Sequence, residues 1–424
     1  MIETRPHKTH ERAILIGLEK EGVSKWDLQD SLDELRELAN SAGAEVVDTV
    51  TQKLQKPTAP YYIGRGKAEA IKDSCQDRQV TSVIFDDELS PAQGRNLENL
   101  LARKVLDRTQ LILDIFAQRA RSREGRLQIE LAQLQYLLPR LTRMWHHLSR
   151  QTGGIGTRGP GETQLEVDRR RVQERIARLE RELEAVRKTR AVQRQGRKRH
   201  QWPVAAVVGY TNAGKSTLLN LLTGADLVAE DKLFATLDPT TRSFVLPNKQ
   251  RVLLTDTVGF LRKLPHTLIE SFKATLEEVS EADLLIHIVD LSHPRIDEQM
   301  EAVDGVIKEL DAFGKQTLIV FNKIDNLPNR ELAESYVKRF PGSVAISART
   351  GEGVNTLVQA LENALSSWRL RSRFRIPSNE SALIAEIHRV GHVLELRYEG
   401  NDALIVAHVP PELAQKLERY AARN

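Results

Sequence analysis

The sequence predicts a multidomain α/β protein with four parts, and three observations support this fold class. Apolar runs that suit strands alternate with helical patterns early in the chain. Two seams of heptad-spaced apolar residues follow, and a glycine-rich turn then lies between a buried strand and a helix. The expected parts are an N-terminal βαβ domain, a basic two-helix coiled-coil hairpin, a P-loop domain and a small C-terminal α+β domain. Their expected boundaries are residues 1–115, 116–200, 201–370 and 371–424.

The composition suits a chain that folds into several globular domains. There are 424 residues, and 40% of them are apolar. The single cysteine, Cys75, cannot form an internal disulfide, and the first residues lack the apolar core of a secretory signal. The longest apolar runs are far shorter than the ~20 residues that cross a bilayer. We therefore expect a cytosolic protein without a membrane span.

The first part alternates strands and helices, which indicates βαβ units and a mostly parallel sheet. The expected strands are residues 13–18, 45–54 and 80–85, and the expected helices are residues 31–42, 67–78 and 91–101. A turn at Gly64 precedes a helix start, where an anion such as ATP could bind. It lacks the spacer of a P-loop, so a plain turn is favoured over a second nucleotide site.

The second part carries two apolar seams with alternating steps of three and four residues. One seam runs through Leu127, Leu131, Leu134, Leu138, Leu141, Trp145 and Leu148, and the other through Val172, Ile176, Leu179, Leu183 and Val186. Such spacing predicts two helices that face one another in a hairpin, with a kink at Pro139. The intervening segment, SRQTGGIGTRGPG, holds five glycines, two arginines and no acid. We expect this loop to let the backbone approach RNA closely.

Charge is unevenly distributed along the chain. The formal net charge is only +4, yet residues 116–200 carry a net +12, which leaves −8 for the rest. A local excess of this size favours a polyanionic partner over a merely solvated helix face, and nucleic acid is the usual polyanion. Aromatic residues are only 5% of the chain, so contacts from arginine and backbone are expected rather than base stacking.

The third part contains a P-loop in its required context. A buried strand at residues 204–208 leads into GYTNAGKST, and a helical run follows. Glycines in such a loop turn backbone N–H groups toward phosphate oxygens at a helix N-terminus. Lys215 is expected to reach the β and γ phosphates, and the Ser216 hydroxyl to bind Mg²⁺. The expected binding residues of the loop are Gly209, Tyr210, Thr211, Asn212, Ala213, Gly214, Lys215, Ser216 and Thr217.

Three later strand ends specify the base. The first ends in Asp256, Thr257, Val258 and Gly259, which suit Mg²⁺ and the γ phosphate; the second ends in Asn322, Lys323, Ile324 and Asp325; the third ends in Ser347, Ala348 and Arg349. A carboxylate at Asp325 can accept both donors of the guanine edge, whereas adenine offers no such pair. The order of these motifs predicts GTP as substrate, so the third part is a P-loop GTPase domain.

The motifs GYTNAGKST, FATLDPTTR, DTVGF, NKID and SAR, with the preceding GGIGTRGPGETQLE loop, closely resemble the HflX family of ribosome-associated GTPases. The resemblance implies binding to the large (50S) ribosomal subunit, through its RNA and proteins, and a role in splitting or rescuing stalled or idle ribosomes. It also implies that Thr236 joins Ser216 on Mg²⁺ and acts in catalysis with Lys215 and Gly259. The segment around it, Phe234, Ala235, Thr236, Leu237 and Asp238, is expected to bind the nucleotide.

Two residues bear on the hydrolysis mechanism. Phe260 stands where Ras-like hydrolases carry a glutamine that orients water, and a phenyl ring cannot donate or accept such a hydrogen bond. Slow hydrolysis in isolation, stimulated by the partner, is therefore expected. Asn212 occupies the loop position that holds a monovalent cation in some related GTPases, which raises K⁺ dependence as a hypothesis.

The fourth part is expected to hold strands at residues 382–388, 392–397 and 403–408, and a helix at residues 411–422. No catalytic constellation is visible there. For the whole chain, a monomer away from the ribosome is expected. A ribosome-assembly GTPase, an ATP-dependent RNA-remodelling protein and a non-enzymatic RNA-binding scaffold remain alternatives.

Overall fold

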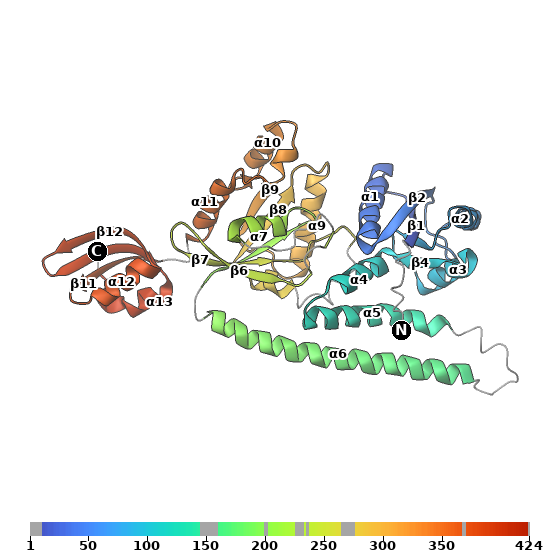
Figure 1. The fold of residues 1–424 in the computed structure, drawn as a ribbon, viewed down its shortest axis with the longest axis horizontal. Coiled ribbons are helices and arrows are strands. Elements are labelled where there is room, and N and C mark those ends of the chain that lie inside the picture. Colours follow the sequence, from blue (N-terminus) through green and yellow to red (C-terminus); the bar gives the residue numbers. More distant parts are fainter. Residues whose placement is uncertain are drawn as a thin grey trace, which may run out of the picture. The chain divides into compact units, whose positions relative to one another are not determined.

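A computed structural model describes residues 11–144, 160–198, 202–224, 233–234, 237–263, 276–366 and 370–422 (Figure 1). The chain forms two compact units. The first unit contains Met1–Val186 with two short later segments, Lys232–Leu237 and Arg262–Phe272, and the second contains the remainder. Two short pieces of the P-loop region therefore belong with the N-terminal part of the chain.

The N-terminal sheet has four parallel strands in the order β2-β1-β3-β4. The strands are β1 (Glu11–Glu19), β2 (Ala44–Lys53), β3 (Ser82–Phe85) and β4 (Lys104–Asp107), and the helices are α1 (Lys25–Ala42), α2 (Arg65–Asp77), α3 (Pro91–Leu101) and α4 (Arg108–Arg119). Capping boxes at Ser24 and Ser90 begin α1 and α3. The three predicted strands and three predicted helices are confirmed, although α1 begins six residues before the predicted start at residue 31, while β4 and α4 were not predicted.

The hairpin is formed by α5 (Arg123–Met144) and α6 (Pro160–Lys198). Leu127 and Leu131 of α5 pack against Leu179 and Leu183 of α6, which confirms that the two seams face each other. Arg175 also donates two hydrogen bonds to the Glu130 carboxylate, at 2.7 and 2.8 Å. Residues 145–159, which include most of the glycine-rich segment, lie outside the described residues, and the kink expected at Pro139 remains a prediction.

The P-loop domain is built on a six-stranded sheet in the order β10-β9-β8-β5-β7-β6, in which only β6 is antiparallel. Its strands are β5 (Val204–Gly209), β6 (Thr240–Val245), β7 (Arg251–Asp256), β8 (Leu284–Asp290), β9 (Thr317–Asn322) and β10 (Val344–Ala345). Its helices include α7 (Lys215–Thr223), α9 (Ile296–Glu309), α10 (Glu331–Arg339) and α11 (Val354–Ala364). The parallel strands bring the carboxyl ends of β5, β7, β8 and β9 to one edge, where ligands of such sheets bind.

The C-terminal domain is a three-stranded antiparallel sheet, ordered β11-β13-β12, with short helices. Its elements are β11 (Leu370–Pro377), α12 (Ser381–Val390), β12 (His392–Glu399), β13 (Asp402–Val409), α13 (Pro411–Lys416) and the 3-10 turn η3 (Glu418–Tyr420). The predicted strand at residues 382–388 is wrong, because this segment is helix α12. Leu383, Ile384 and Ile387 pack on the core at helical spacing, which a short apolar run does not reveal.

Candidate guanine nucleotide site

The P-loop connects β5 to α7 through backbone conformations that need glycine. Gly209 has φ +152°, and a Cβ there would lie 2.3 Å from the Ile288 carbonyl oxygen. Gly214 has φ +96°, and a Cβ would lie 2.2 Å from Nδ2 of Asn322. Asn212 also has a positive φ, +60°, a region that asparagine tolerates better than most residues. These two glycines therefore allow the loop to pack directly on β8 and on the end of β9.

Lys215 begins α7 and is buried inside the loop. Its Nζ donates to the carbonyl oxygens of Tyr210 at 2.7 Å and Gly209 at 3.2 Å. Burial lowers the pKa of Lys215 to about 8, although the nearby Asp256 carboxylate opposes this shift. A bound phosphate would supply the negative charge that this buried ammonium lacks, so the loop is an anion site by its electrostatics as well as its shape.

The two oxygen groups suited to magnesium lie side by side. The Ser216 hydroxyl donates to Oδ2 of Asp256 at 2.6 Å, and Asp256, at the end of β7, is fully buried. Hydroxyl and carboxylate oxygens are the ligands that Mg²⁺ takes in phosphate sites, so these residues fit the ion. Thr236 and Ala235 lie outside the described residues. Among the described residues, no group of three His, Cys, Asp or Glu side chains is placed to hold a metal ion.

The segment after Asp256 packs closely on the P-loop. Thr257 donates through Oγ1 to the Val207 carbonyl at 2.7 Å, and Val258 is buried beside it. A Cβ on Gly259 would lie 2.7 Å from Thr211 Cγ2 and 3.0 Å from Lys215 Nζ, so a side chain there would press on the lysine. Phe260 is 1% exposed, and its backbone exchanges hydrogen bonds with Gly209 and Thr211 at 3.1 and 2.8 Å. The phenyl ring is thus a core group.

Asn322 connects the base-binding segments to the P-loop. Its Nδ2 donates to the Ala213 carbonyl at 2.8 Å, and its Oδ1 accepts from the Ala348 N–H at 2.9 Å. Both bonds are buried. One side chain thus fixes the phosphate loop relative to the end of β10.

Asp325 is the carboxylate at the base position. Its Oδ1 accepts from the Ser347 hydroxyl at 2.7 Å, and Arg349 forms an ion pair with it. The hydrogen bond from Ser347 and the Arg349 charge hold the pKa of Asp325 below its usual range, so it is ionised at neutral pH. Lys323, with φ +64°, reaches back to Asp290 at 2.7 Å, and Ile324 is buried. An ionised acceptor is the state that the two guanine donors need.

The segment around Thr236 is only partly described. Phe234 and Leu237 are both buried, and the Phe234 ring packs edge-on against Phe116 of α4, with centroids 4.6 Å apart. Phe234 and Leu237 belong to the first compact unit, whereas Asp238 belongs to the second.

A buried charge cluster in the first unit was not found from the sequence. The Arg108 guanidinium donates to Asp86 Oδ1 at 2.9 Å and to the Arg262 carbonyl at 3.2 Å, and it also contacts Glu34. Lys263, beside Arg262, pairs with Asp86. Although burial opposes the shift, Arg108 and Lys263 keep the pKa of Asp86 below its usual range. The only available signal was an acidic residue directly after a strand, at Asp86.

The Gly64 turn does not resemble a second phosphate loop in its bonding. The Gly64 N–H, at the start of α2, donates to Oε1 of Gln52 at 2.9 Å. One of the backbone donors that an anion would need is therefore already used.

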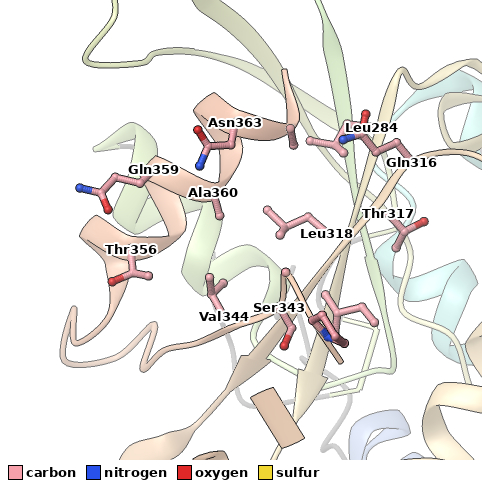
Figure 2. Close-up of a pocket in the computed structure, with 14 residues that line it drawn as sticks. Leu284, Gln316, Thr317, Leu318, Ser343, Val344, Thr356, Gln359, Ala360 and Asn363 are labelled. Carbon is pink, nitrogen blue, oxygen red and sulfur yellow. The ribbon is translucent and has the colours of Figure 1, made fainter. Parts of the chain in front are cut away.

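A cavity of about 570 Å³ lies at the opposite edge of the P-loop sheet (Figure 2). It is bounded by the first residues of β8, β9 and β10 and by one side of α11. None of its lining side chains is ionisable, as Figure 2 shows for Ser343, Thr356, Gln359 and Asn363. Without a cation it is not suited to a triphosphate, which points to the edge around Lys215 as the nucleotide site.

Comparison with known protein families matches three successive parts of the chain. Residues 29–117 match the family described as GTP-binding GTPase N-terminal, residues 119–197 the GTP-binding GTPase middle region, and residues 204–323 the 50S ribosome-binding GTPase family. No helix within the described part of the chain is long and apolar enough to cross a membrane.

Several curated relatives are similar over nearly the whole chain. A protein of Caldanaerobacter subterraneus named GTPase HflX is 48% identical over 97% of this chain and 94% of its own length. The GTPase HflX of Escherichia coli is 47% identical over 86% of this chain and 85% of its own length. Among solved structures, a GTP-binding protein from Sulfolobus solfataricus in complex with GDP is 26% identical over 84% of this chain and 99% of its own, with a TM-score of 0.45.

Proposed function

Because the chain belongs to the HflX family of GTPases and hydrolyses GTP, we propose that it acts on the large ribosomal subunit, where it splits or rescues stalled or idle ribosomes. The observation that carries this proposal is the presence, in one chain, of a P-loop with a guanine-selective carboxylate at Asp325 and of a hairpin with exposed arginines. The family match over residues 204–323, described as 50S ribosome-binding, supports the choice of partner. With such a partner, the proposed location is the cytoplasm. When the protein is not bound to the ribosome, the proposed state is a monomer.

Each part of the nucleotide site has a proposed role. The P-loop amides and Lys215 hold the β and γ phosphates, and Asp325 accepts the guanine N1–H and 2-amino donors, with Asn322, Ser347 and Ala348 completing the base site. Ser216 and Thr236 hold Mg²⁺, with Asp256 beside Ser216. Mg²⁺, when bound, neutralises charge on the phosphates during transfer. K⁺ at Asn212 is a further proposal, which equal rates in K⁺ and Na⁺ would dismiss.

The hairpin supplies the proposed contact with ribosomal RNA. Along α6, the side chains of Arg170 and Arg171 are 73% and 75% exposed, and Arg178 is 68% exposed. Exposed arginines on one long helix attract phosphodiester backbones and lose that attraction at high salt. The glycine-rich segment at the tip, Gly153 to Gly161, is proposed to approach the RNA near the peptidyl-transferase region.

Hydrolysis is proposed to need the partner. Since Phe260 is buried and apolar, this position offers no polar side chain to orient the attacking water. A group or an ordering contact from the ribosome must compensate, and the segment around Thr236 and Gly259 is the element that it would order. GTP binding then favours the ribosome-bound state, and hydrolysis releases it.

The test measures GTP hydrolysis with large subunits, small subunits and protein-free ribosomal RNA added separately. We expect large subunits to stimulate the rate at least tenfold, and deletion of residues 153–161 to remove most of that stimulation. Co-sedimentation with ribosomes should be stronger with a nonhydrolysable GTP analogue than with GDP. Equal stimulation by every additive, or equal co-sedimentation in every nucleotide state, would contradict the proposal.

An assembly role is the second candidate within the same activity. Its distinguishing observation would be preferential stimulation by immature large-subunit particles rather than by mature subunits or whole ribosomes. The same measurement therefore separates the two roles.

A further inference from the structure

The C-terminal sheet has one face covered by helices and one face without them (Figure 1). Phe374, Ile376 and Ile405 point toward the covered face, where Ile387 of α12 and Leu413 of α13 pack on them in one apolar cluster. In the described part of this domain, no helix packs on the other face, which we call the open face. Side chains alternate between the two faces along each strand.

The strand register places nine residues of the open face in three rows. Across β11, β13 and β12, the rows are Arg371–His408–His392, Arg373–Val406–Glu395 and Arg375–Leu404–Arg397. The four arginines, Glu395 and His392 are exposed, and the central strand contributes half-buried residues. The open face therefore has half-buried residues along the central strand β13 and exposed polar residues along the two outer strands. On β11 these polar residues are three successive arginines.

Counted over four rows, with the next row along the strands included, the open face carries four arginines and three carboxylates, so its net charge is +1 and the two signs are unevenly placed. Its three rows contain four arginines and one carboxylate, Glu395, which pairs with Arg397 at 2.6 Å. The next row along the strands holds Asp402 and Glu399, and Asp402 pairs with Arg375 at 2.7 Å. The carboxylates thus gather around one end of the face, and Arg371 lies at the other end.

The chemistry of this face fits the backbone of a nucleic acid. Arg371, Arg373 and Arg375 follow one another at about 6.7 Å along the strand, a spacing comparable to that of successive phosphates. Guanidinium groups bind phosphate oxygens through two parallel hydrogen bonds. The three rows contain no Phe, Tyr or Trp on which bases could stack, so contact with phosphates and sugars is expected rather than base reading. An acidic protein would not need so regular a row of charges.

We propose that the open face of the C-terminal sheet binds the phosphodiester backbone of RNA, as a second contact separate from the hairpin. This inference rests on the proposed association with the ribosome, because ribosomal RNA is the polyanion that such an association offers. It assigns a role to a domain in which the sequence shows no catalytic constellation.

The test uses the full chain and measures binding to protein-free large-subunit RNA by filter retention at several salt concentrations. The variant R371Q/R373Q removes two charges from the open face. The matched control, R389Q/R419Q, removes two exposed charges from α12 and η3 of the same domain. Basal GTP hydrolysis and thermal unfolding should be unchanged in both variants, since neither touches the nucleotide site or the core.

We expect R371Q/R373Q to weaken RNA binding by about 3- to 10-fold near 0.1 M salt, and to reduce the slope of log K against log salt by about 1.4 to 1.8. The control should change the affinity less than about twofold. Equal losses in both variants, or no loss in R371Q/R373Q, would overturn the inference. A loss seen only with intact subunits, and not with protein-free RNA, would assign the face to a ribosomal protein instead. If the unaltered protein binds neither subunits nor RNA, the proposed function itself fails.

Discussion

The N-terminal sheet and the P-loop sheet both have charged groups at the carboxyl ends of their parallel strands, but these charges are balanced differently. At the N-terminal sheet, the buried cation Arg108 lies against Asp86 and Glu34, and Lys263 adds a further pairing. At the P-loop sheet, the buried Lys215 lies against carbonyl oxygens, and its pKa falls to about 8. The first edge is electrostatically complete, whereas the second still requires an anion. We therefore interpret the charge cluster of the N-terminal sheet as structural and the strand ends of the P-loop sheet as a binding site.

The largest expected effect comes from removing the cation of the incomplete edge. Lys215→Ala should reduce GTP hydrolysis by about 10²- to 10³-fold, because a buried charge aimed at the transferred phosphate is lost. Single-turnover rates with saturating nucleotide measure the effect, and Lys338→Ala, on the exposed side of α10, serves as the control. A rate within tenfold of that of the unaltered protein would contradict the inference that the P-loop edge needs Lys215 to bind an anion.

Removing a carboxylate from the charge cluster of the N-terminal sheet should lower stability rather than the rate of GTP hydrolysis. Asp86→Asn leaves Arg108 buried with one fewer carboxylate, so local unfolding should become easier by about 3 kcal/mol. Amide hydrogen exchange in β3 and β4 measures this change, and Asp73→Asn on the surface of α2 is the control.

The same variant carries a pH signature. Since the folded pKa of Asp86 is lowered, its stabilising contribution is fully present above the unfolded pKa of about 4 and is lost as the pH falls through the folded value. The unaltered protein should therefore lose its advantage over Asp86→Asn below about pH 4. A constant difference between pH 3 and pH 7 would contradict this account.

Base selection tests whether the P-loop edge is completed specifically by a guanine nucleotide. Asp325→Asn should weaken GTP binding by about 10²-fold, because the amide nitrogen presents a donor to the guanine 2-amino group, and should favour xanthosine triphosphate, which has a carbonyl in place of that amino group. Competition binding with both nucleotides measures the ratio, with Asp311→Asn as the control. An unchanged preference would place the base elsewhere.

The pH dependence of GTP affinity should show the smallest of these effects. It tests the difference between the two sheets most directly, because it depends on the charge of Lys215. A bound triphosphate favours the charged form of Lys215 and raises its pKa from about 8. Below that value the lysine is already protonated, so affinity is flat; above it, GTP affinity should fall by up to about tenfold per pH unit. Calorimetry at pH 8.5 in buffers of different ionisation enthalpy should detect proton uptake. Absence of uptake would indicate that Lys215 is already charged without a ligand.

The sequence was most informative where a motif and its structural context coincide. The P-loop between β5 and α7 follows from local spacing and strand ends, and the facing seams of α5 and α6 follow from heptads. Helix α12 was mistaken for a strand because its apolar run is short and contains two β-branched isoleucines, so that periodicity does not decide between the two structures.

Contacts between residues far apart in the sequence could not be predicted from local sequence patterns. Lys263 and Asp86 are separated by 177 positions, and nothing in either local pattern indicates the other. Strand β11 was not predicted, because its alternating arginines make this segment look like a polar domain boundary. Its outward row of charges is the basis of the proposed RNA contact.

The length of α6 has a mechanical consequence. A continuous helix of 39 residues extends over about 58 Å. A tilt of about 10° at the end nearest β5 would displace the far end by about 10 Å. A small rotation of one end of this helix is therefore converted into a displacement of several ångströms at the other end.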